Sequence, residues 1–373
     1  MIDIIIPAYN AHKTIGKTLC SIMLQSRRDL VNVYIVNDCS STNYQEFVKK
    51  YKKYFNIEEL DIPQNVGPGG ARNYGMKHSK GKYIIFLDSD DIVPDDAYEK
   101  MYLAAEKNHS EMVVGSVARF NSKKDHVSNL HEIAFRKYID KTHITDNTDL
   151  IYDTTSWNKL ILKEFWDRNH FEFPERILYE DIPVTIPMHY LANNVTMVQD
   201  VCYRWRIRDG ANKSITQRAD DFTNMRDRIT VLRMVDKFFE ENVKEQELWD
   251  AKYYKWLYID LMIYVNNCIY LSDNRTLEMM KIIKDYIEET IPLETIDKLP
   301  VLYREKYVAL MNLDEKRLVK LRQYEVDNYK NLKIVKKGNK YIGKFPKAIV
   351  TGDKADMTEA LDQWRLTQLI YDV

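Results

Sequence analysis

Residues 82–91 read Lys-Tyr-Ile-Ile-Phe-Leu-Asp-Ser-Asp-Asp, an apolar strand that opens into a cluster of carboxylates. Alternate residues of an extended segment point the same way, so Asp88 and Asp90 can face one ligand together. Two close carboxylates repel each other unless a cation neutralises them. Mn²⁺ or Mg²⁺ suits such a pair, above all where phosphate groups complete the coordination shell. The alternative interpretation is a turn whose aspartates cap the following helix.

Strands and helices alternate on both sides of this segment. Continuous apolar runs predict buried strands, and apolar residues spaced three and four apart predict helices between them. The expected strands are 2–6, 31–36, 57–62, 82–87 and 111–117, and the expected helices are 14–25, 44–54, 71–79 and 94–108. This alternation is typical of an α/β fold with a mostly parallel sheet that is covered by helices on both faces.

Polar clusters follow four of these strands. In open parallel sheets, ligands bind beyond the carboxyl ends of the strands. Those ends carry Pro7-Ala8-Tyr9-Asn10, Asn37-Asp38, the glycine-rich segment 64–73, and Asp88-Ser89-Asp90-Asp91. Four polar clusters at four strand ends predict one shared site.

The glycine-rich segment has features of a phosphate site. Its glycines allow close backbone approach, and Arg72 offers a fork of donors suited to phosphate. A helix that begins at Ala71 would present free N–H groups to an anion. A plain glycine turn is the alternative. A nicotinamide fingerprint would need G-x-G-x-x-G directly after the first strand, whereas the first glycine of this chain is Gly16.

Composition argues against several other classes of protein. The chain has 373 residues, and 55 Lys and Arg stand against 56 Asp and Glu, so no global field attracts nucleic acid or lipid. Its four cysteines lie far apart, which excludes a disulfide scaffold and fits a reducing cytosol. The N-terminus lacks the basic start of a signal peptide. The most apolar later stretch, 256–271, is interrupted by polar residues and predicts a buried helix of a soluble protein.

Taken in order, the motifs at 5–10, 36–40, 65–73 and 88–91 resemble those of the family 2 glycosyltransferases with a GT-A fold. The resemblance covers about residues 1–217 and implies a Rossmann-like domain that binds a nucleotide sugar. In that family the first two motifs hold the nucleotide base and ribose. The D-x-D motif coordinates a divalent metal that is bound to the diphosphate.

The resemblance assigns roles to individual residues. It implies nucleotide-sugar-binding residues at Pro7, Ala8, Tyr9, Asn10, Asp38, Asn65, Gly69, Arg72, Asp88 and Ser89. Of these, Pro7, Ala8, Tyr9 and Asp38 would line a uridine pocket, whereas Asn65 and Arg72 would lie near the base and the phosphates. Asp90 would be the direct ligand of Mn²⁺ or Mg²⁺, and Asp88 would touch the ribose or the water shell of the metal.

Two further segments resemble parts of the same family. Tyr179-Glu180-Asp181 is similar to its E-D motif, whose aspartate is the catalytic base of inverting enzymes. An acceptor hydroxyl attacks poorly until a carboxylate takes its proton. We therefore expect Asp181 to be the base and Glu180 to position the acceptor or stabilise the loop; the alternative is a cap of the helix 182–191. Residues 157–160, Trp-Asn-Lys-Leu, are similar to the N-K-L segment of bacterial members.

Residues 206–216 resemble the R-x-G-S-I-T lid that closes over the diphosphate in the family, which implies that Arg206 and Ser214 contact the donor. Three residues, Ala211-Asn212-Lys213, separate Gly210 from Ser214 and depart from that pattern. Either Arg206 or Arg208 can therefore be the arginine that contacts the diphosphate.

The rest of the chain is strongly helical and ends in a basic tail. We expect a catalytic domain at 1–217, a helical domain at 218–315, and a tail at 316–373 with a β-hairpin around Lys337-Gly338-Asn339 and a terminal helix. Between Lys316 and Lys347, eleven Lys and Arg stand against two acids. A solvated linker would explain this excess as simply as a bound polyanion.

The resemblance implies a metal-dependent inverting enzyme, a hexosyl- or N-acetylhexosaminyltransferase that uses a UDP-sugar. The tail is similar to the region that follows the catalytic domain in staphylococcal-type wall teichoic acid glycosyltransferases, and a polyol-phosphate acceptor would be attracted by its charge. The alternatives are a neutral acceptor in capsule or exopolysaccharide synthesis, and a non-catalytic nucleotide-sugar-binding partner. We expect no nucleic-acid partner and a cytoplasmic location. Proximity to the inner face of the membrane and a homo-oligomer remain open.

Overall fold

The computed structural model describes residues 1–121, 125–135, 138–207, 222–267, 275–328, 334–338, 340–346, 348–350 and 354–356. Contacts divide the chain into two compact units. The first comprises Met1–Ile215 and Val231–Asn242, and the second comprises Thr216–Thr230 and Val243–Val373. The long helix α8 (Phe222–Asn242) therefore contributes residues to both units.

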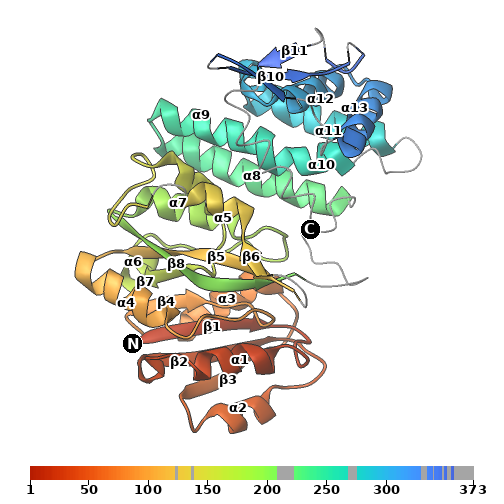
Figure 1. Cartoon of the computed structure of the whole chain (residues 1–373). Helices are drawn as coiled ribbons and strands as arrows, with labels where there is room; N and C mark the ends of the chain where they lie inside the picture. Colours follow the sequence, from red (N-terminus) through yellow and green to blue (C-terminus); the bar gives the residue numbers. More distant parts are fainter. Residues whose placement is uncertain are drawn as a thin grey trace. The chain divides into compact units, whose positions relative to one another are not determined.

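The first unit is built on an eight-stranded sheet with the order β3-β2-β1-β4-β7-β5-β6, and β8 pairs with β5 (Figure 1). The strands are β1 Ile2–Ala8, β2 Val31–Asp38, β3 Asn56–Ile62, β4 Tyr83–Phe86, β5 Met112–Phe120, β6 Asp125–Val127, β7 Lys159–Leu162 and β8 Val195–Arg206. The pairs of β1 with β2 and β4, of β2 with β3, and of β5 with β8 are parallel. The predicted mostly parallel sheet is confirmed, and β7 enters it antiparallel between β4 and β5.

Helices cover both faces of this sheet. The helices of the first 215 residues are α1 Ile15–Met23, α2 Gln45–Tyr51, α3 Gly67–His78, α4 Ala97–Asn108, α5 Asn129–Ala134, α6 Lys163–Arg168 and α7 Ile182–Leu191. The even-numbered residues of β1, among them Ile4, share one core with α1 and α4. Ile5 faces α3 on the other side, where a Cβ atom on Gly75 would lie 2.4 Å from Ile5 Cγ2. Because both faces are covered, β1 is buried at every position.

One predicted helix begins earlier than expected. The expected start was Ala71, whereas α3 begins at Gly67 and includes Pro68 in its first turn. The reason is a long-range contact: the Asp38 carboxylate accepts the backbone N–H groups of Val66 at 2.8 Å and of Gly67 at 3.0 Å. An anion of the chain itself therefore binds the N–H groups at the start of α3, whereas the expected anion site lay at a helix start at Ala71.

The region after β5 contains more regular structure than its sequence pattern indicated. Two strands, β7 and β8, complete the sheet there, and β8 alone spans 12 residues. The pairing of β8 with β5 shifts register between Gly115 and Val117. Such a bulge interrupts the regular alternation of inward and outward side chains, which explains why the local pattern did not predict this strand.

The second unit is mainly helical. Its helices besides the start of α8 are α9 Gln246–Lys255, the π-helical turn η4 Trp256–Leu261, α10 Met262–Asn267, α11 Arg275–Thr290, η6 Leu293–Lys298, α12 Val301–Met311 and α13 Glu315–Asn328. The described part of the apolar stretch, 256–267, is helical and largely buried, and Asp260 pairs there with Lys255 at 2.7 Å and Arg228 at 2.8 Å. Within the described residues, no helix is both long and apolar enough to cross a membrane.

The basic tail contains a small antiparallel sheet. Its strands are β9 Ile334–Lys337, β10 Lys340–Lys344 and β11 Lys354–Asp356. The first two form the predicted hairpin, with Gly338 at φ +59° in the turn. The expected terminal helix lies outside the described residues. The division into domains at 217 and 315 stays a prediction.

Candidate active site

The parallel strands β1, β2 and β4 bring three of the polar clusters to one edge of the sheet. The first two clusters are joined directly, because Asn10 donates its N–H to Ser40 Oγ at 2.9 Å and accepts the N–H of Ser41 at 3.0 Å. Pro7 and Ala8 are buried beneath them. Tyr9 is 58% exposed, which makes its ring the accessible surface of this edge.

Asp38 fixes the backbone at the start of the glycine-rich segment through hydrogen bonds. Its side chain is buried, and besides the two N–H groups it accepts a bond from Asn65 Nδ2 at 2.9 Å. Burial raises the pKa of Asp38, and the N–H groups of Val66 and Gly67 oppose that rise. The consequence is a fixed start for α3, the helix that carries Arg72.

Arg72 lies at the centre of the site. Its guanidinium donates through Nη2 to Asp88 Oδ1 at 2.8 Å, and through Nη1 to Glu180 Oε1 at 2.5 Å and Asp181 Oδ1 at 3.2 Å. The side chain is only 3% exposed. Burial alone would lower the pKa of Arg72, but the three carboxylates raise it. One buried arginine thus joins the D-x-D segment to the E-D segment, although these segments lie about ninety residues apart.

Asp181 is held by more than Arg72. Its carboxylate accepts Ser156 Oγ–H at Oδ1, 3.0 Å away, and Ser156 N–H at Oδ2, 3.1 Å away. It stands at the N-cap position of α7, but its side chain makes no capping hydrogen bond. Asp181 therefore has the N-cap position that the alternative interpretation expected, but not the capping hydrogen bond. With 16% of its side chain exposed, Asp181 remains accessible from the site.

Glu180 is more buried than its neighbour. Burial raises the pKa of Glu180 to about 7, Arg72 opposes the rise, and the negative charge of Asp181 adds to it. Glu180 and Asp181 both accept a hydrogen bond from Nη1 of Arg72.

The D-x-D segment is fixed by β8. Tyr203 Oη accepts the N–H of Asp88 at 3.2 Å and donates to Asp91 Oδ2 at 2.6 Å. Arg206 donates its N–H to Asp91 Oδ1 at 2.7 Å and its Nε–H to the carbonyl of Asp90 at 2.6 Å. The helix that follows begins only at Ala97 and has Asp96 at its N-cap, so Asp88 and Asp90 do not cap it.

Negative charge accumulates at this segment. Burial raises the pKa values of Asp88 and Asp91, and the charge of Asp90 raises both further. A divalent cation would relieve that repulsion. Among the described residues, no group of three or more His, Cys, Asp or Glu is arranged to hold a metal alone. A cation shared between one or two carboxylates and substrate phosphates needs no such group, so Asp90 and Asp88 fit that role.

The structure also places the remaining predicted residues. Ser89 accepts a bond from Thr18 Oγ1 through its carbonyl at 3.1 Å. Gly69 packs so closely that a Cβ atom there would lie 2.4 Å from the carbonyl oxygen of Pro174. Ser214 and Arg208 lie outside the described residues. Arg206 ends β8 beside Asp90 of the D-x-D segment.

Ser156 and Tyr203 are among the residues that contact the site and were missed from the sequence. Ser156 directly precedes the segment 157–160 that resembles N-K-L, which was the available signal for it. Tyr203 lies in β8 more than a hundred residues from the aspartates that it binds, and nothing in the local pattern indicates that contact.

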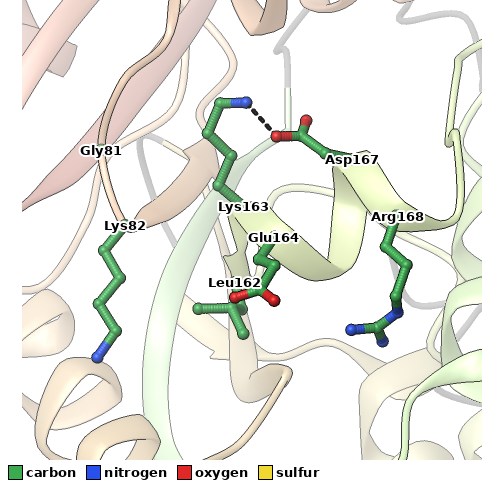
Figure 2. Close-up of a pocket in the computed structure, with 7 residues that line it drawn as sticks. All are labelled: Gly81, Lys82, Leu162, Lys163, Glu164, Asp167 and Arg168. Atoms are coloured by element: carbon green, nitrogen blue, oxygen red, sulfur yellow. Dashed lines mark hydrogen bonds and ion pairs between the residues drawn. The ribbon is translucent and has the colours of Figure 1, made fainter.

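A separate cavity of about 630 Å³ lies elsewhere (Figure 2). It is lined by Gly81, Lys82, Leu162, Lys163, Glu164, Asp167 and Arg168. Gly81 binds Asp3 at the amino end of β1, which is the opposite edge of the sheet from Asp88. Lys163 is paired with Asp167 at 2.6 Å, and Arg168 is paired with Glu111, which does not line the cavity, at 2.7 Å. This cavity is not a candidate for the active site.

Comparisons with known sequences identify relatives of this chain. Residues 3–169 match the model of Glycosyl transferase family 2. Over 251 residues the chain is 25% identical to the poly(ribitol-phosphate) beta-N-acetylglucosaminyltransferase TarS of Staphylococcus aureus. The aligned region covers 66% of this chain and 42% of that protein. Over 219 residues it is 27% identical to a poly(ribitol-phosphate) beta-glucosyltransferase of Bacillus spizizenii, covering 57% and 33%. The chain thus spans less than half the length of these relatives.

Solved structures share the fold. Residues 1–349 of S. aureus TarS, in complex with UDP-GlcNAc, superpose with a TM-score of 0.72 at 20% identity, covering 93% of this chain and 97% of that one. The mannosyltransferase PcManGT of Pyrobaculum calidifontis, in complex with GDP-Man and Mn²⁺, gives a TM-score of 0.50 at 12% identity over 87% and 84%. The expected GT-A fold is confirmed.

Proposed function

Residues 3–169 belong to glycosyl transferase family 2, and from this premise we propose that the chain moves a sugar from a UDP-sugar to a hydroxyl of a cell-surface glycopolymer, with inversion. The observation that supports this most is the set of bonds around Arg72. Through it, the carboxylates proposed to face the donor and those proposed to face the acceptor share one buried cation.

The donor end of the site is proposed to lie at the edge formed by β1, β2 and β4. Pro7, Ala8, Tyr9, Asn10, Asp38 and Asn65 would form the uridine pocket, and Arg206 and Ser214 would approach the diphosphate. Asp90 would hold Mn²⁺ or Mg²⁺, with Asp88 beside it. When bound, that cation would stabilise negative charge on the leaving diphosphate. The Mn²⁺ complex of PcManGT supports this choice of ion.

Asp181 is proposed to act as the base. The acceptor oxygen bonds to the anomeric carbon as the bond to the diphosphate breaks, and the hydroxyl proton passes to Asp181. The bonds from Ser156 and Arg72 hold the Asp181 carboxylate in a fixed orientation for this step. Glu180 would keep Arg72 in place beneath it. Direct attack needs no covalent intermediate, and a single displacement inverts the anomeric centre.

A polyol phosphate is the acceptor that we favour. Both curated relatives carry poly(ribitol-phosphate) in their names. Between Lys316 and Lys347, eleven Lys and Arg stand against two acids, and this excess of positive charge would attract a polyanion. A neutral acceptor of capsule or exopolysaccharide synthesis is the second candidate.

The sugar is proposed to be N-acetylglucosamine or glucose, the two that the names of these relatives carry. A non-catalytic binding partner would have no need of Asp88, Asp90 and Asp181 together, which argues against that role. We also propose a cytoplasmic location, supported by the four scattered cysteines.

Transfer assays test this proposal. UDP-GlcNAc and UDP-glucose would be supplied with poly(ribitol phosphate), and in parallel with a neutral oligosaccharide. We expect one donor to be consumed faster with poly(ribitol phosphate), with the sugar recovered on the polymer in the β configuration when the donor is α-linked. Transfer to the neutral acceptor alone would replace the acceptor assignment, and retention of configuration would refute the direct displacement.

A further inference from the structure

We propose that Ser156 is a positioning residue that fixes the orientation of the Asp181 carboxylate, on a segment, 153–159, that a buried polar network holds rigid. The inference rests on the proposed function, because it assumes that Asp181 takes the proton of the acceptor.

Ser156 contacts both oxygens of the same carboxylate. Its hydroxyl donates to Asp181 Oδ1 at 3.0 Å, and its backbone N–H donates to Oδ2 at 3.1 Å. Two bonds from one residue define the plane of the carboxylate, so rotation of the Asp181 side chain would break at least one of them. Arg72 adds a third donor at Oδ1, 3.2 Å away. Ser156 itself is only 1% exposed, so water does not compete for these bonds.

The segment that carries Ser156 is anchored from beneath. Lys159 and Asp153 are both fully buried, and Lys159 Nζ lies 2.7 Å from Asp153 Oδ2. The same ammonium donates to the carbonyl of Thr155 at 2.7 Å, directly beside Ser156. Asn158 Nδ2 donates to the second carboxylate oxygen of Asp153 at 2.8 Å. A buried pair with its remaining hydrogen-bonding groups satisfied in this way fixes the local backbone.

Helix α7, which begins after Asp181, is tied to the same network. Thr185 Oγ1 donates to the carbonyl of Thr154 at 3.0 Å, and His189 Nε2 lies 3.1 Å from Asp153 Oδ2. The segment 153–159 therefore holds Asp181 through its side chain and the helix behind it through two further contacts.

The other side of this segment reaches the D-x-D aspartates. Trp157 stacks on Tyr203 with ring centroids 4.0 Å apart, and Tyr203 is the residue that binds both Asp88 and Asp91. Adjacent residues, Ser156 and Trp157, thus support the proposed base and the proposed metal ligands. Their common anchor sets the spacing between these groups, and a general base works only when it is held within reach of its proton.

The test uses the full chain and compares Ser156→Ala, Ser156→Thr and Ser110→Ala with the wild type. Ser110 is the matched control, because it is also buried and its hydroxyl bonds Thr196 Oγ1 at 2.7 Å. For each protein, UDP release from UDP-GlcNAc and UDP-glucose with poly(ribitol phosphate) is measured from pH 5 to 9, together with the Kd of UDP. An unchanged Kd for UDP shows that the variant is folded.

We expect Ser156→Ala to lower kcat by roughly tenfold, with the KM of the donor nearly unchanged, because a bond to a charged group is lost. The profile of kcat from pH 5 to 9 should also differ from that of the wild type, because the proposed base has lost one hydrogen-bond donor. Ser156→Thr keeps the hydroxyl and should restore most of kcat. Ser110→Ala should keep both the rate and the profile of the wild type.

Each other outcome has one meaning. If Asp181→Asn abolishes activity but Ser156→Ala keeps the kcat and the pH profile of the wild type, only the role of Ser156 is overturned. Full activity of Asp181→Asn would overturn the base assignment and this inference with it. A wild type that releases UDP from neither donor would overturn the proposed function itself. If Ser156→Ala fails to bind UDP, a Ser156→Thr protein that binds UDP but gains no activity would also contradict the inference.

Discussion

At the scale of single residues, we expect substitution of Arg72 to have the largest effect on activity, because its one guanidinium binds three carboxylates. Arg72→Lys keeps the charge, but one compact ammonium cannot bridge Asp88 and the E-D pair at once. We expect kcat for UDP-sugar turnover to fall by about 100-fold, in line with two lost charged hydrogen bonds. Steady-state kinetics with the donor that the wild type uses would measure this.

The matched control for that substitution is Arg27→Lys. Arg27 pairs with Asp29 at 3.0 Å but is 40% exposed and lies in a surface turn. Its conservative change should alter neither the rate nor the melting temperature. Equal losses in both variants would show that the effect at Arg72 does not come from its bridging position.

A second prediction at this scale concerns pH and the buried His131. Burial lowers the pKa of His131 to about 3, with Asp153 opposing the shift. The unfolded chain binds a proton there near pH 6.5, whereas the folded protein does not. The free energy of unfolding should therefore fall as the pH drops below 6.5, by about 1.4 kcal/mol per pH unit from this group. His189 adds a shift of the same sign.

His131→Gln removes one of these two protons from the balance. Its side chain can still meet Ser128 and Thr155, the partners of His131 at 3.0 and 3.1 Å. Urea unfolding at pH 6.5, 5.5 and 4.5 should give a shallower loss of stability in the variant than in the wild type. Parallel curves for the two proteins would mean that the folded state takes up the proton at His131.

The sequence pointed to candidate site residues but to few of their contacts. Asp88 and Asp90 follow from a strand end, whereas Glu180 and Asp181 follow from the resemblance to the E-D motif of the family. The bonds from Arg72 to Asp88 and Glu180 do not, because they join positions 16 and 108 residues apart. Local patterns carry no information about which side of a folded chain a distant arginine will reach.

At the scale of elements, the start of α3 determines where Arg72 lies. Gly69→Ala would bring a Cβ atom to 2.4 Å from the carbonyl oxygen of Pro174 and 3.2 Å from Glu180 Cγ. Because backbone cannot yield as a side chain can, α3 must move away from Glu180. We expect a loss of about 1–3 kcal/mol in the free energy of unfolding and a lower kcat. Denaturant unfolding and steady-state kinetics measure the two effects.

Gly16→Ala, in α1, is the control. Its Cβ atom would meet only the edge of the Phe47 ring of α2, 3.3 Å away. Alanine favours a helix interior over glycine by about 0.5–1 kcal/mol, so this variant should match or exceed the wild type in stability. If Gly69→Ala behaved in the same way, the close packing of α3 on the segment 173–180 would not be what positions Arg72.

Element boundaries show where sequence patterns fail. The glycines and the proline of 67–70 are typical of a loop, yet they form the first turn of α3, because Asp38 caps that turn from another strand. The strand β8 was missed because a bulge interrupts its alternation. Strands buried on both faces, such as β1, were predicted correctly, since their continuous apolar sequence depends on no distant partner.

At the scale of the whole molecule, the basic tail makes a prediction about the acceptor. If poly(ribitol phosphate) is attracted by that charge, its KM should rise several-fold when the salt concentration is raised from 0.05 to 0.5 M, as screening shortens the range of the attraction. Release of UDP without acceptor, measured over the same salt series, serves as the control for the donor. An acceptor KM that does not change with salt would show that the charge of the tail does not attract the acceptor.

The overall architecture was largely predictable. The alternation of strands and helices predicted the parallel part of the sheet. The chain does not reveal by local pattern that α8 contributes to two compact units. That division depends on which helices pack together, and the amphipathic face of a helix does not specify its partner.

The most direct test of the central claim is the release of UDP from a panel of UDP-sugars without acceptor, in Mn²⁺, in Mg²⁺ and in chelator. We expect slow hydrolysis of one donor. This hydrolysis should be lost in chelator and in Asp90→Ala, while the fold of the variant is preserved. If neither the wild type nor Asp90→Ala released UDP from any donor, and UDP itself did not bind, the assignment as a UDP-sugar transferase would be contradicted.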